Sequence, residues 1–397
     1  MLKGFKVRLL PTKEQEKILW QSVNGFRWAW NWGLATQMER FENGEKFLSQ
    51  FDLRKEFRKI RKLPGNEWLT ECGANAMCMA FTDLDVAYSR FFKAQKQNKK
   101  FCDKTIARAK RLGKNLSSYD KIGHPKFKDK KHTRTAFALQ NDSLNVYEKG
   151  FSIDKVGKVA YKTDFKFKLG QHAEKFFNPR VAFIGGKWIL SFAMEVVNKQ
   201  YKLNDYNMGI DLGVKDLAIV SCNGQKIVYK NNNKSGKVRK LNKKLRRQQR
   251  QADRMQKGSN RQKKAYARVG KQMNHLGNIR HDYTHKTTHA IVSMLPKTIV
   301  MEDLNVIGLL KNKYLSRAIR EQGFSRFRFQ VEYKSAERGI TVLFANRFYP
   351  SSKMCSCCGN VKHDLKLSDR TYKCEVCGVQ IDRDFNAARN LEVLAVA

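Results

Sequence analysis

Two cysteine pairs near the end of the sequence constrain the fold more than any other feature. The first lies in the run C-S-C-C-G that begins at Cys355, and the second in C-E-V-C-G from Cys374. C-x-x-C repeated after about fifteen residues is the spacing of a four-thiolate zinc ribbon, and the glycine of each run supplies a permissive backbone. Cys357 is not preferred as a ligand, because it lacks the two-residue spacing. The expected ligands of one structural Zn²⁺ are Cys355, Cys358, Cys374 and Cys377.

The excess of positive charge limits the binding partners. The chain has 397 residues, with 79 Lys and Arg against 36 Asp and Glu, a formal net charge of +43. Such a charge repels itself in a compact protein unless a polyanion neutralises it. Nucleic acid is the expected polyanion. An acidic membrane surface is the alternative, but the sequence has no basic amphipathic anchor or lipidation motif.

The sequence predicts a cytosolic protein of two or three folded units. Its first ten residues alternate basic and apolar side chains and lack the apolar core of a signal peptide. No run approaches the roughly 18 apolar residues of a membrane span. Thiols and metal are expected rather than disulfides. Four scattered cysteines are interpreted as ordinary thiols of the interior: Cys72, Cys78, Cys102 and Cys222.

Residues 1–120 predict a strand followed by a basic helical bundle. The strand is Met1–Leu10, and Thr12 with Gln15 forms a capping-box helix start. Apolar and aromatic residues then recur at helical spacing. They are Leu19, Trp20, Val23, Phe26, Trp28, Trp30, Trp32 and Leu34. We interpret this stripe as core, with stacking on bases as the alternative.

From residue 123 to about 200, short alternating segments predict a small antiparallel sheet or barrel, with which the first strand can pair. Gly185-Gly186 between two apolar runs indicates a tight hairpin. A basic run opens this segment. Its lysines either contact phosphates or form a solvated surface: Lys126, Lys128, Lys130 and Lys131.

A third region begins near Asn207 with apolar strands. Two later apolar strands end at Met301 and at Ala345. Between them, residues 234–280 are rich in Lys, Arg and Gln, with Asp253 as the only acid. With so few acids for i,i+4 pairs, we expect a nucleic-acid-facing helical pair rather than a solvated hairpin. The basic residues assigned to this contact are Lys243, Lys244, Arg246, Arg247 and Arg250.

Three acids stand out by their positions. Asp211 interrupts an apolar strand, Glu302 ends another, and Asp384 opens the final helix. A carboxylate in an apolar strand is costly unless it is paired or holds a cation. Together the three resemble the acidic cluster of an RNase H-like fold, in which oxygen ligands hold two Mg²⁺ (or Mn²⁺) ions for phosphodiester hydrolysis. Asp382 is the runner-up for the third position.

A rival metal site is also present in the sequence. His281, His285 and His289 share one face of a helix. However, the H-E-x-x-H pattern of zinc hydrolases is absent, so packing or phosphate contacts are favoured.

The motifs in combination resemble the TnpB (OrfB) family of transposon-encoded RuvC-like proteins, relatives of compact type V CRISPR effectors. The resemblance rests on G-I-D-L-G from Gly209, M-E-D-L from Met301, P-S-S-K-M-C-S from Pro350 and D-R-D-F-N-A-A-R-N from Asp382. It extends over almost the whole chain. By motif position, Asp211, Glu302 and Asp384 match the family's catalytic acids, and the four cysteines match its zinc ligands.

The resemblance implies an RNA-guided DNA endonuclease that binds a structured omega RNA and cuts double-stranded DNA beside a short transposon-adjacent motif. The implied architecture is α/β with α and β modules. A wedge-type β-barrel would comprise residues 1–15 and 123–200, and a helical recognition domain residues 16–122. A RuvC-like nuclease domain would comprise residues 205–353 and 379–397, with a zinc ribbon inserted at residues 354–378.

Three other functions stay open. A CRISPR effector would share the chemistry and differ in the source of its guide. A catalysis-independent guided binder or repressor would normally lack one of the acids. A strand-transfer transposase would act without copurifying RNA.

Overall fold

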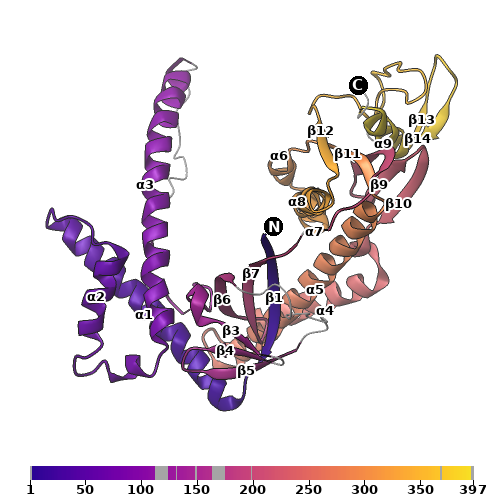
Figure 1. The fold of residues 1–397 in the computed structure, drawn as a ribbon. Coiled ribbons are helices and arrows are strands. Elements are labelled where there is room, and N and C mark those ends of the chain that lie inside the picture. Colours follow the sequence, from indigo (N-terminus) through magenta and orange to yellow (C-terminus); the bar gives the residue numbers. More distant parts are fainter. Residues whose placement is uncertain are drawn as a thin grey trace. The chain divides into compact units, whose positions relative to one another are not determined.

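The chain, described here as a computed structural model, separates into two compact units: unit 1 is Met1–Val196 and unit 2 is Val197–Ala397 (Figure 1). The described residues are 2–111, 124–130, 132–147, 150–162, 175–197, 199–366 and 369–394, with side chains described for all of these except 94–111. No helix in these ranges combines the length and the apolar character that a membrane crossing requires.

The helices of unit 1 form the predicted basic bundle. They are α1 (Lys13–Glu42), α2 (Gln50–Ile60) and α3 (Ala74–Arg111), with the 3₁₀ segments η1 (Glu67–Thr70) and η2 (Asn141–Ser143). The predicted capping box is confirmed: the Gln15 N–H donates to Thr12 Oγ1 at 3.3 Å, and the Thr12 N–H donates to Gln15 Oε1 at 3.1 Å. The apolar stripe of α1 is core as expected, and Trp20 is its one exposed member.

Unit 1 also contains a seven-stranded antiparallel sheet in the order β2-β6-β7-β1-β5-β4-β3. Its strands are β1 (Leu2–Leu10), β2 (Ala136–Ala138), β3 (Asn145–Tyr147), β4 (Gly150–Ile153), β5 (Gly157–Lys162), β6 (Phe176–Ile184) and β7 (Lys187–Glu195). The first strand of the chain pairs with β7 and β5, as the sequence indicated. Within the described residues the pairing does not close into a barrel, because the three-residue strands β2 and β3 end the order.

The predicted hairpin is confirmed between β6 and β7. Gly185 and Gly186 both have positive φ, 59° and 80°. A turn with two left-handed residues matches the twist of paired strands, and glycine adopts it without steric cost. Trp20 of α1 packs on this hairpin, with its ring centroid 4.9 Å from that of Phe183 and 5.1 Å from that of Trp188. The helices and the sheet of unit 1 therefore share one core.

Unit 2 is built on a five-stranded mixed sheet in the order β10-β9-β8-β11-β12. Its strands are β8 (Asn204–Leu212), β9 (Asp216–Cys222), β10 (Gln225–Lys230), β11 (Pro296–Glu302) and β12 (Thr341–Ala345). β8, β9 and β10 are antiparallel neighbours, whereas β11 is parallel to both β8 and β12. A separate two-stranded sheet joins β13 (Thr371–Lys373) to β14 (Gln380–Asp382).

The helices of unit 2 include one long uninterrupted helix and a pair that is broken at a glycine. They are α4 (Gly236–Asp253), α5 (Asn260–Ser293), α6 (Val306–Leu310), α7 (Ser316–Gln322), α8 (Phe324–Ala336) and α9 (Arg383–Val393), with the 3₁₀ segment η3 (Asn232–Lys234). Helix α5 runs without a break, because Ser259 caps it and no proline interrupts it. Helices α7 and α8 are separate, because Gly323 between them adopts a left-handed conformation with φ 69°.

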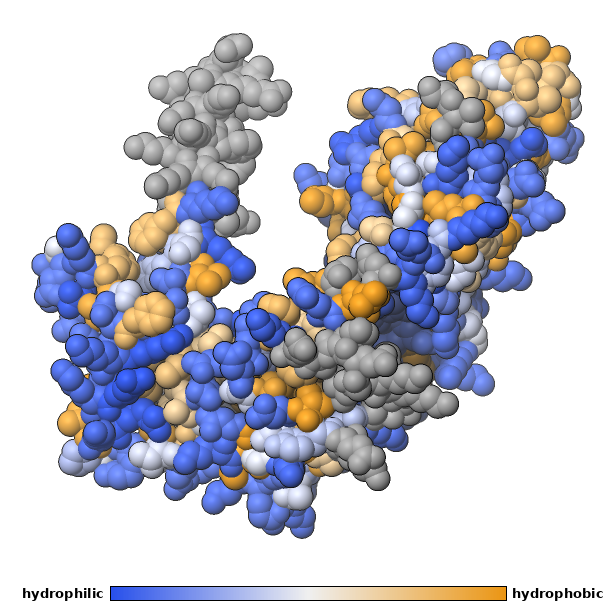
Figure 2. Space-filling view, viewed as in Figure 1, coloured by the Kyte–Doolittle hydropathy of each residue, from blue (hydrophilic) through white to orange (hydrophobic). Residues whose placement is uncertain are grey.

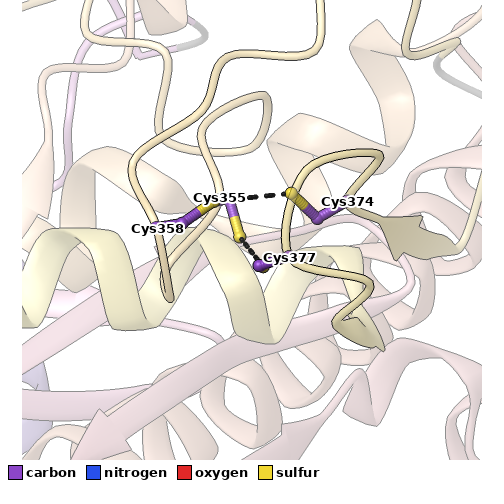
Figure 3. Close-up of side chains that lie close together, drawn as sticks. All are labelled: Cys355, Cys358, Cys374 and Cys377. Carbon is purple, nitrogen blue, oxygen red and sulfur yellow. Dashed lines mark hydrogen bonds between the residues drawn. The ribbon is translucent and has the colours of Figure 1, made fainter.

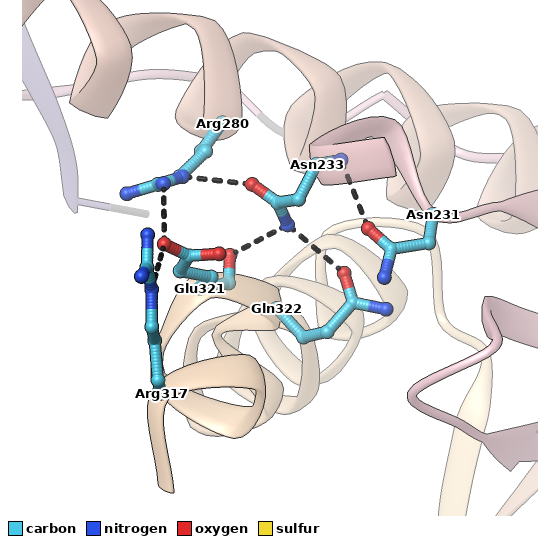
Figure 4. A network of polar contacts seen from close by, with 6 residues as sticks. All are labelled: Asn231, Asn233, Arg280, Arg317, Glu321 and Gln322. Atoms are coloured by element: carbon cyan, nitrogen blue, oxygen red, sulfur yellow. Dashed lines mark hydrogen bonds and ion pairs between the residues drawn. The ribbon is translucent and has the colours of Figure 1, made fainter. Parts of the chain in front are cut away.

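A polar network ties the turn after β10 to α5 and α7 (Figure 4). Asn233 accepts from Arg280 Nε at 2.8 Å and donates to the Glu321 carbonyl at 3.0 Å. Glu321 also pairs with Arg280 and Arg317, each at 3.2 Å. Gln322 donates to the Gly213 carbonyl at 3.0 Å. The network therefore fixes the loop that directly follows β8.

Helix α9 packs directly on β8 because Gly209 has no side chain. A Cβ built on Gly209 would lie 2.0 Å from the Ala388 carbonyl oxygen and 2.4 Å from the Glu392 nitrogen. Both are backbone atoms, which cannot rotate away. Near the other end of α9, the Glu392 carboxylate accepts from the Ser221 hydroxyl of β9 at 2.5 Å. The glycine at position 209 therefore lets the backbone of α9 lie directly against the backbone of β8.

We predict that Gly209→Ala lowers the free energy of unfolding of unit 2 by about 3 kcal/mol, the upper end of the usual cost of overpacking. Gly270→Ala in α5 is the matched control, since an added Cβ there meets nothing within 4 Å and alanine is the better helix former. Chemical denaturation of both variants measures the difference. Equal stability of the two would contradict the close contact between α9 and β8.

Candidate functional site

The four predicted cysteine ligands lie together (Figure 3). The Sγ atoms of Cys355 and Cys377 are 3.6 Å apart, and those of Cys358 and Cys374 are 3.5 Å apart. All four sulfurs lie within 4.8 Å of one another. Zn–S bonds of about 2.3 Å in a tetrahedron place sulfurs about 3.8 Å apart, so the cluster is the right size for one zinc ion.

The local backbone explains how two short knuckles form this cluster. The Gly359 N–H donates to the Cys355 carbonyl at 2.9 Å, and the Gly378 N–H donates to the Cys374 carbonyl at 3.2 Å. Both glycines have positive φ, 76° and 72°. Backbone N–H groups, that of Cys377 foremost, lower the pKa of the Cys374 thiol to about 6, whereas burial and the neighbouring thiols raise the pKa of Cys377. Cys357 is exposed and outside the cluster.

We predict that Cys374→Ser abolishes stoichiometric zinc binding and lowers the melting temperature, because a three-thiolate site loses much of the folding energy supplied by the metal. Cys357→Ser is the matched control and should keep wild-type zinc content and melting temperature. Metal analysis of the purified proteins and thermal denaturation measure both quantities. Unchanged zinc content in Cys374→Ser would contradict a four-thiolate site.

The three predicted acids approach one another at one edge of the unit 2 sheet. Parallel β8 and β11 pair Ile210 with Met301, so the next residues, Asp211 and Glu302, emerge at the same end of adjacent strands. Asp384 lies in the first turn of α9, which packs on β8. Asp211 interacts electrostatically with both other acids. Residues far apart in the sequence therefore form one carboxylate site.

Burial and like charge dominate the electrostatics of this site. Although Asp211 keeps some solvent exposure, its carboxyl group is enclosed by protein. This burial, and then the charges of Glu302 and Asp384, raise the pKa of Asp211 well above its usual range. Arg383 opposes the effect and donates to Asp384 Oδ1 from Nη2 at 2.9 Å and from Nε at 3.1 Å. A bound cation would relieve the remaining repulsion.

Asp382 has a different role from Asp384. It is the N-cap of α9, and its side chain accepts from the Phe385 N–H at 3.0 Å. It also pairs with Lys226 at 3.3 Å. Asp384 also has a cationic partner, Arg383, but it caps no helix terminus, so it is the better candidate for the third acid.

The acids are more widely spaced than the cysteines. Within the described residues, only the cysteine cluster brings at least three ligand atoms within 4.8 Å of one another. Two ions about 4 Å apart, rather than one, would suit the wider spacing of carboxylates on separate elements. The donor set is also suitable, because Mg²⁺ and Mn²⁺ prefer carboxylate oxygens.

Sequence reasoning missed the side chains that surround Glu302. The Ser351 hydroxyl donates to Glu302 Oε1 at 2.5 Å. The neighbouring Asp303 accepts from Arg328 at 2.7 Å and from Arg347 at 3.0 Å, which lowers the pKa of Asp303. Ser351 lies within the P-S-S-K-M-C-S motif, but nothing in that motif alone indicates which residue it contacts. Glu302, Asp303 and Arg347 also line an open cavity of about 290 Å³.

The histidine site receives no support from the structure. His281 and His285 have ring centroids 4.3 Å apart on α5. Burial, together with the charges of His281 and Lys334, lowers the pKa of His285 to about 4. The histidines do not belong to any cluster of metal-binding groups in the described part of the chain. The packing interpretation is therefore preferred.

Three family models match successive parts of the chain. One described as "Helix-turn-helix domain" matches residues 1–46, "Probable transposase" of OrfB IS605 matches 191–313, and "Cas12f1-like, TNB domain" matches 324–391. In the structure, residues 1–46 contain β1 and the uninterrupted helix α1 rather than two helices.

Two relatives match over almost the whole chain. A Streptomyces pristinaespiralis protein provisionally named an RNA-guided DNA endonuclease is 27 % identical, covering 100 % of this chain and 90 % of the relative. A TnpB-like protein of Acanthamoeba polyphaga mimivirus is 26 % identical, covering 97 % and 72 %. By these matches the chain is similar to the TnpB (OrfB) family. The solved structure of the mini-RNA-guided endonuclease CRISPR-Cas phi3 shares the fold with a TM-score of 0.52, at 11 % identity over 100 % of this chain and 92 % of that one.

The lysines of unit 1 that the sequence assigned to phosphate contacts have unequal surroundings. Lys126 and Lys130 are exposed, whereas Lys131 lies outside the described residues. The Lys128 ammonium lies 3.6 Å from the Trp30 ring centroid, and burial lowers the pKa of Lys128 to about 8. Lys128 is therefore directed at α1, whereas phosphate contact by the exposed Lys126 and Lys130 stays a prediction.

In unit 2 the basic residues of α4 remain available for nucleic acid. The five assigned side chains are all exposed: Lys243, Lys244, Arg246, Arg247 and Arg250. Hydrophilic residues cover most of the visible face of each unit (Figure 2). The α4 stretch and α5 form the expected helical pair, joined at Met255–Ser259. Phosphate contact by these residues stays a prediction.

We predict that Asp211→Asn stabilises the metal-free carboxylate site at neutral pH. Because the pKa of Asp211 is raised on folding, the folded state binds the proton more tightly, and stability falls as pH rises through that pKa. The variant should gain at least about 1 kcal/mol near pH 7.5 and almost nothing near pH 4. Thermal denaturation without added Mg²⁺ measures this. Asp205→Asn on the same strand, 95 % exposed, should show no such pH-dependent gain.

Proposed function

We propose that this protein is an RNA-guided, metal-dependent DNA endonuclease of the TnpB (OrfB) type with a single RuvC-type site. The observation that carries the proposal is the meeting of Asp211, Glu302 and Asp384 at one edge of the mixed sheet. The match to the OrfB IS605 family model and the relative named an RNA-guided DNA endonuclease, similar over the whole chain, support it. The charge of +43 suits a protein that binds guide RNA and target DNA together.

Unit 2 would contain the nuclease domain. Its sheet places β8 and β11 as parallel neighbours, so ligands collect at the carboxyl ends of those strands. We assign residues 205–353 and 379–397 to the RuvC-like domain and residues 354–378 to the zinc ribbon. In unit 1, the sheet and the helices would correspond to the wedge and recognition domains.

The carboxylates and the cysteines would use metal for different purposes. Asp211, Glu302 and Asp384 would together hold two Mg²⁺ (or Mn²⁺) ions. When bound, these ions would activate a water and stabilise the leaving oxygen of a phosphodiester. Because Asp211 is enclosed by protein, its carboxylate would stay in a fixed position beside the ions. Arg383 would hold the carboxylate of Asp384 in the same way. One Zn²⁺ on the cysteines would be structural.

Sequence specificity would come from base pairing between guide and target, while the protein senses duplex shape and a short flanking motif. The retained acids argue against a catalysis-independent repressor. The source of the guide distinguishes a transposon-associated nuclease from a CRISPR effector. Sequencing the RNA that copurifies with the chain addresses both this point and the strand-transfer alternative, which needs no RNA.

We predict that Asp211→Ala or Glu302→Ala keeps the copurifying RNA but reduces Mg²⁺-dependent cleavage about 100- to 1,000-fold, since metal-ion catalysis supplies several kcal/mol. Cleavage of a target with a randomised flank, in Mg²⁺ or in EDTA, measures the activity. Asp205→Ala on the same strand is the matched control. Wild-type cutting by Asp211→Ala would overturn the site assignment.

A further inference from the structure

Ser351 lies at the contact between Glu302 and the segment that leads to the cysteine cluster. Its side chain is almost fully buried, with 4 % of the residue exposed, and its hydroxyl donates to Glu302 Oε1 at 2.5 Å. One carboxylate oxygen of Glu302 is therefore occupied by a neutral donor. A ligand carboxylate held in this way keeps its other oxygen available for a cation.

Two buried asparagines of α9 hold the same segment. We call Ser351–Ser356 the strap. Asn390 Nδ2 donates to the Ser351 carbonyl at 2.7 Å and to the Met354 carbonyl at 2.6 Å. Asn386 Nδ2 donates to the Met354 carbonyl at 2.6 Å, and its Oδ1 accepts from the Ser356 N–H at 3.0 Å. The exposed fractions of Asn386 and Asn390 are 0 % and 3 %.

These contacts connect three parts of unit 2. Cys355 belongs to the strap, so the first cysteine knuckle continues directly from it. Asn386 and Asn390 belong to the helix that carries Asp384. Ser351 reaches Glu302 at the end of β11. Since buried amides hold the strap at several points, the strap is a rigid link and not a free loop.

We propose that Ser351 is a positioning residue that orients Glu302 for metal binding. Asn390, on the helix α9 that also carries Asp384, would hold Ser351 in place. The inference rests on the proposed function, because it assigns Glu302 to the metal site. Its consequence is that the cysteine module does more than stabilise the fold. By anchoring the strap at Cys355, it sets the orientation of a carboxylate on another element.

The adjacent serine supplies a control of the same chemistry. Ser352 has partial exposure and makes no hydrogen bond to an acid of the described residues, whereas its neighbour Ser351 is buried against Glu302. Replacing either serine by alanine removes one hydroxyl from the same motif. Only the Ser351 change removes a hydrogen bond to a proposed ligand.

The test measures Mn²⁺ binding to the zinc-loaded full-length chain by electron paramagnetic resonance, without nucleic acid. Ser351→Ala should raise the Mn²⁺ dissociation constant at least about 10-fold, the usual effect of losing a partner that orients a ligand. Zinc content and melting temperature should stay at wild-type values. Ser351→Thr, which keeps the hydroxyl, should restore binding, and Ser352→Ala should bind as wild type.

A second variant tests the role of the asparagine. Asn390→Ala should also weaken Mn²⁺ binding, and the double variant Ser351→Ala with Asn390→Ala should lose less than the sum of the two effects, because both act through one contact. Additive losses would overturn the link between Asn390 and Ser351.

The outcomes separate this inference from the proposed function. The carboxylate metal site is wrong if the wild-type protein binds no Mn²⁺, or if Asp211→Asn binds Mn²⁺ as well as wild type does. The inference then fails with it. If wild type binds Mn²⁺ and Ser351→Ala binds equally well, only the positioning role is wrong.

Discussion

The contact between α9 and β8 at Gly209 is the constraint on which the carboxylate site depends. No side chain separates the two backbones there, and any Cβ would overlap the helix. This close approach brings the first turn of α9, with Asp384, to the strand that carries Asp211. A bulkier residue at Gly209 would move the helix outward and separate the acids.

The carboxylate site has an energetic cost in the absence of metal. An enclosed Asp211 beside two further acids lowers the stability of the folded state at neutral pH. Arg383 compensates in part through its bond to Asp384. Since folded proteins are only marginally stable, such a cluster must be supported by its surroundings. The buried asparagines of α9 and the packing of that helix supply this support.

Thiolates and carboxylates in unit 2 suit different metals for different purposes. The cysteine cluster is compact and built from two local knuckles, which suits a structural ion. The acids come from a strand, a strand end and a helix start, and their wider spacing suits ions that take part in chemistry. The strap from Ser351 to Ser356 lies between the two sites, so their geometries are physically connected.

The sequence by itself determined what depends on local spacing and residue type. The C-x-x-C pairs predict the cysteine cluster because each knuckle closes within five residues, and Gly185-Gly186 predicts its hairpin for the same reason. Tertiary structure alone decided which side chains meet across elements. It turns Lys128 onto Trp30 and places Ser351 on Glu302. These contacts join distant segments through packing, and packing leaves no periodicity in a single sequence.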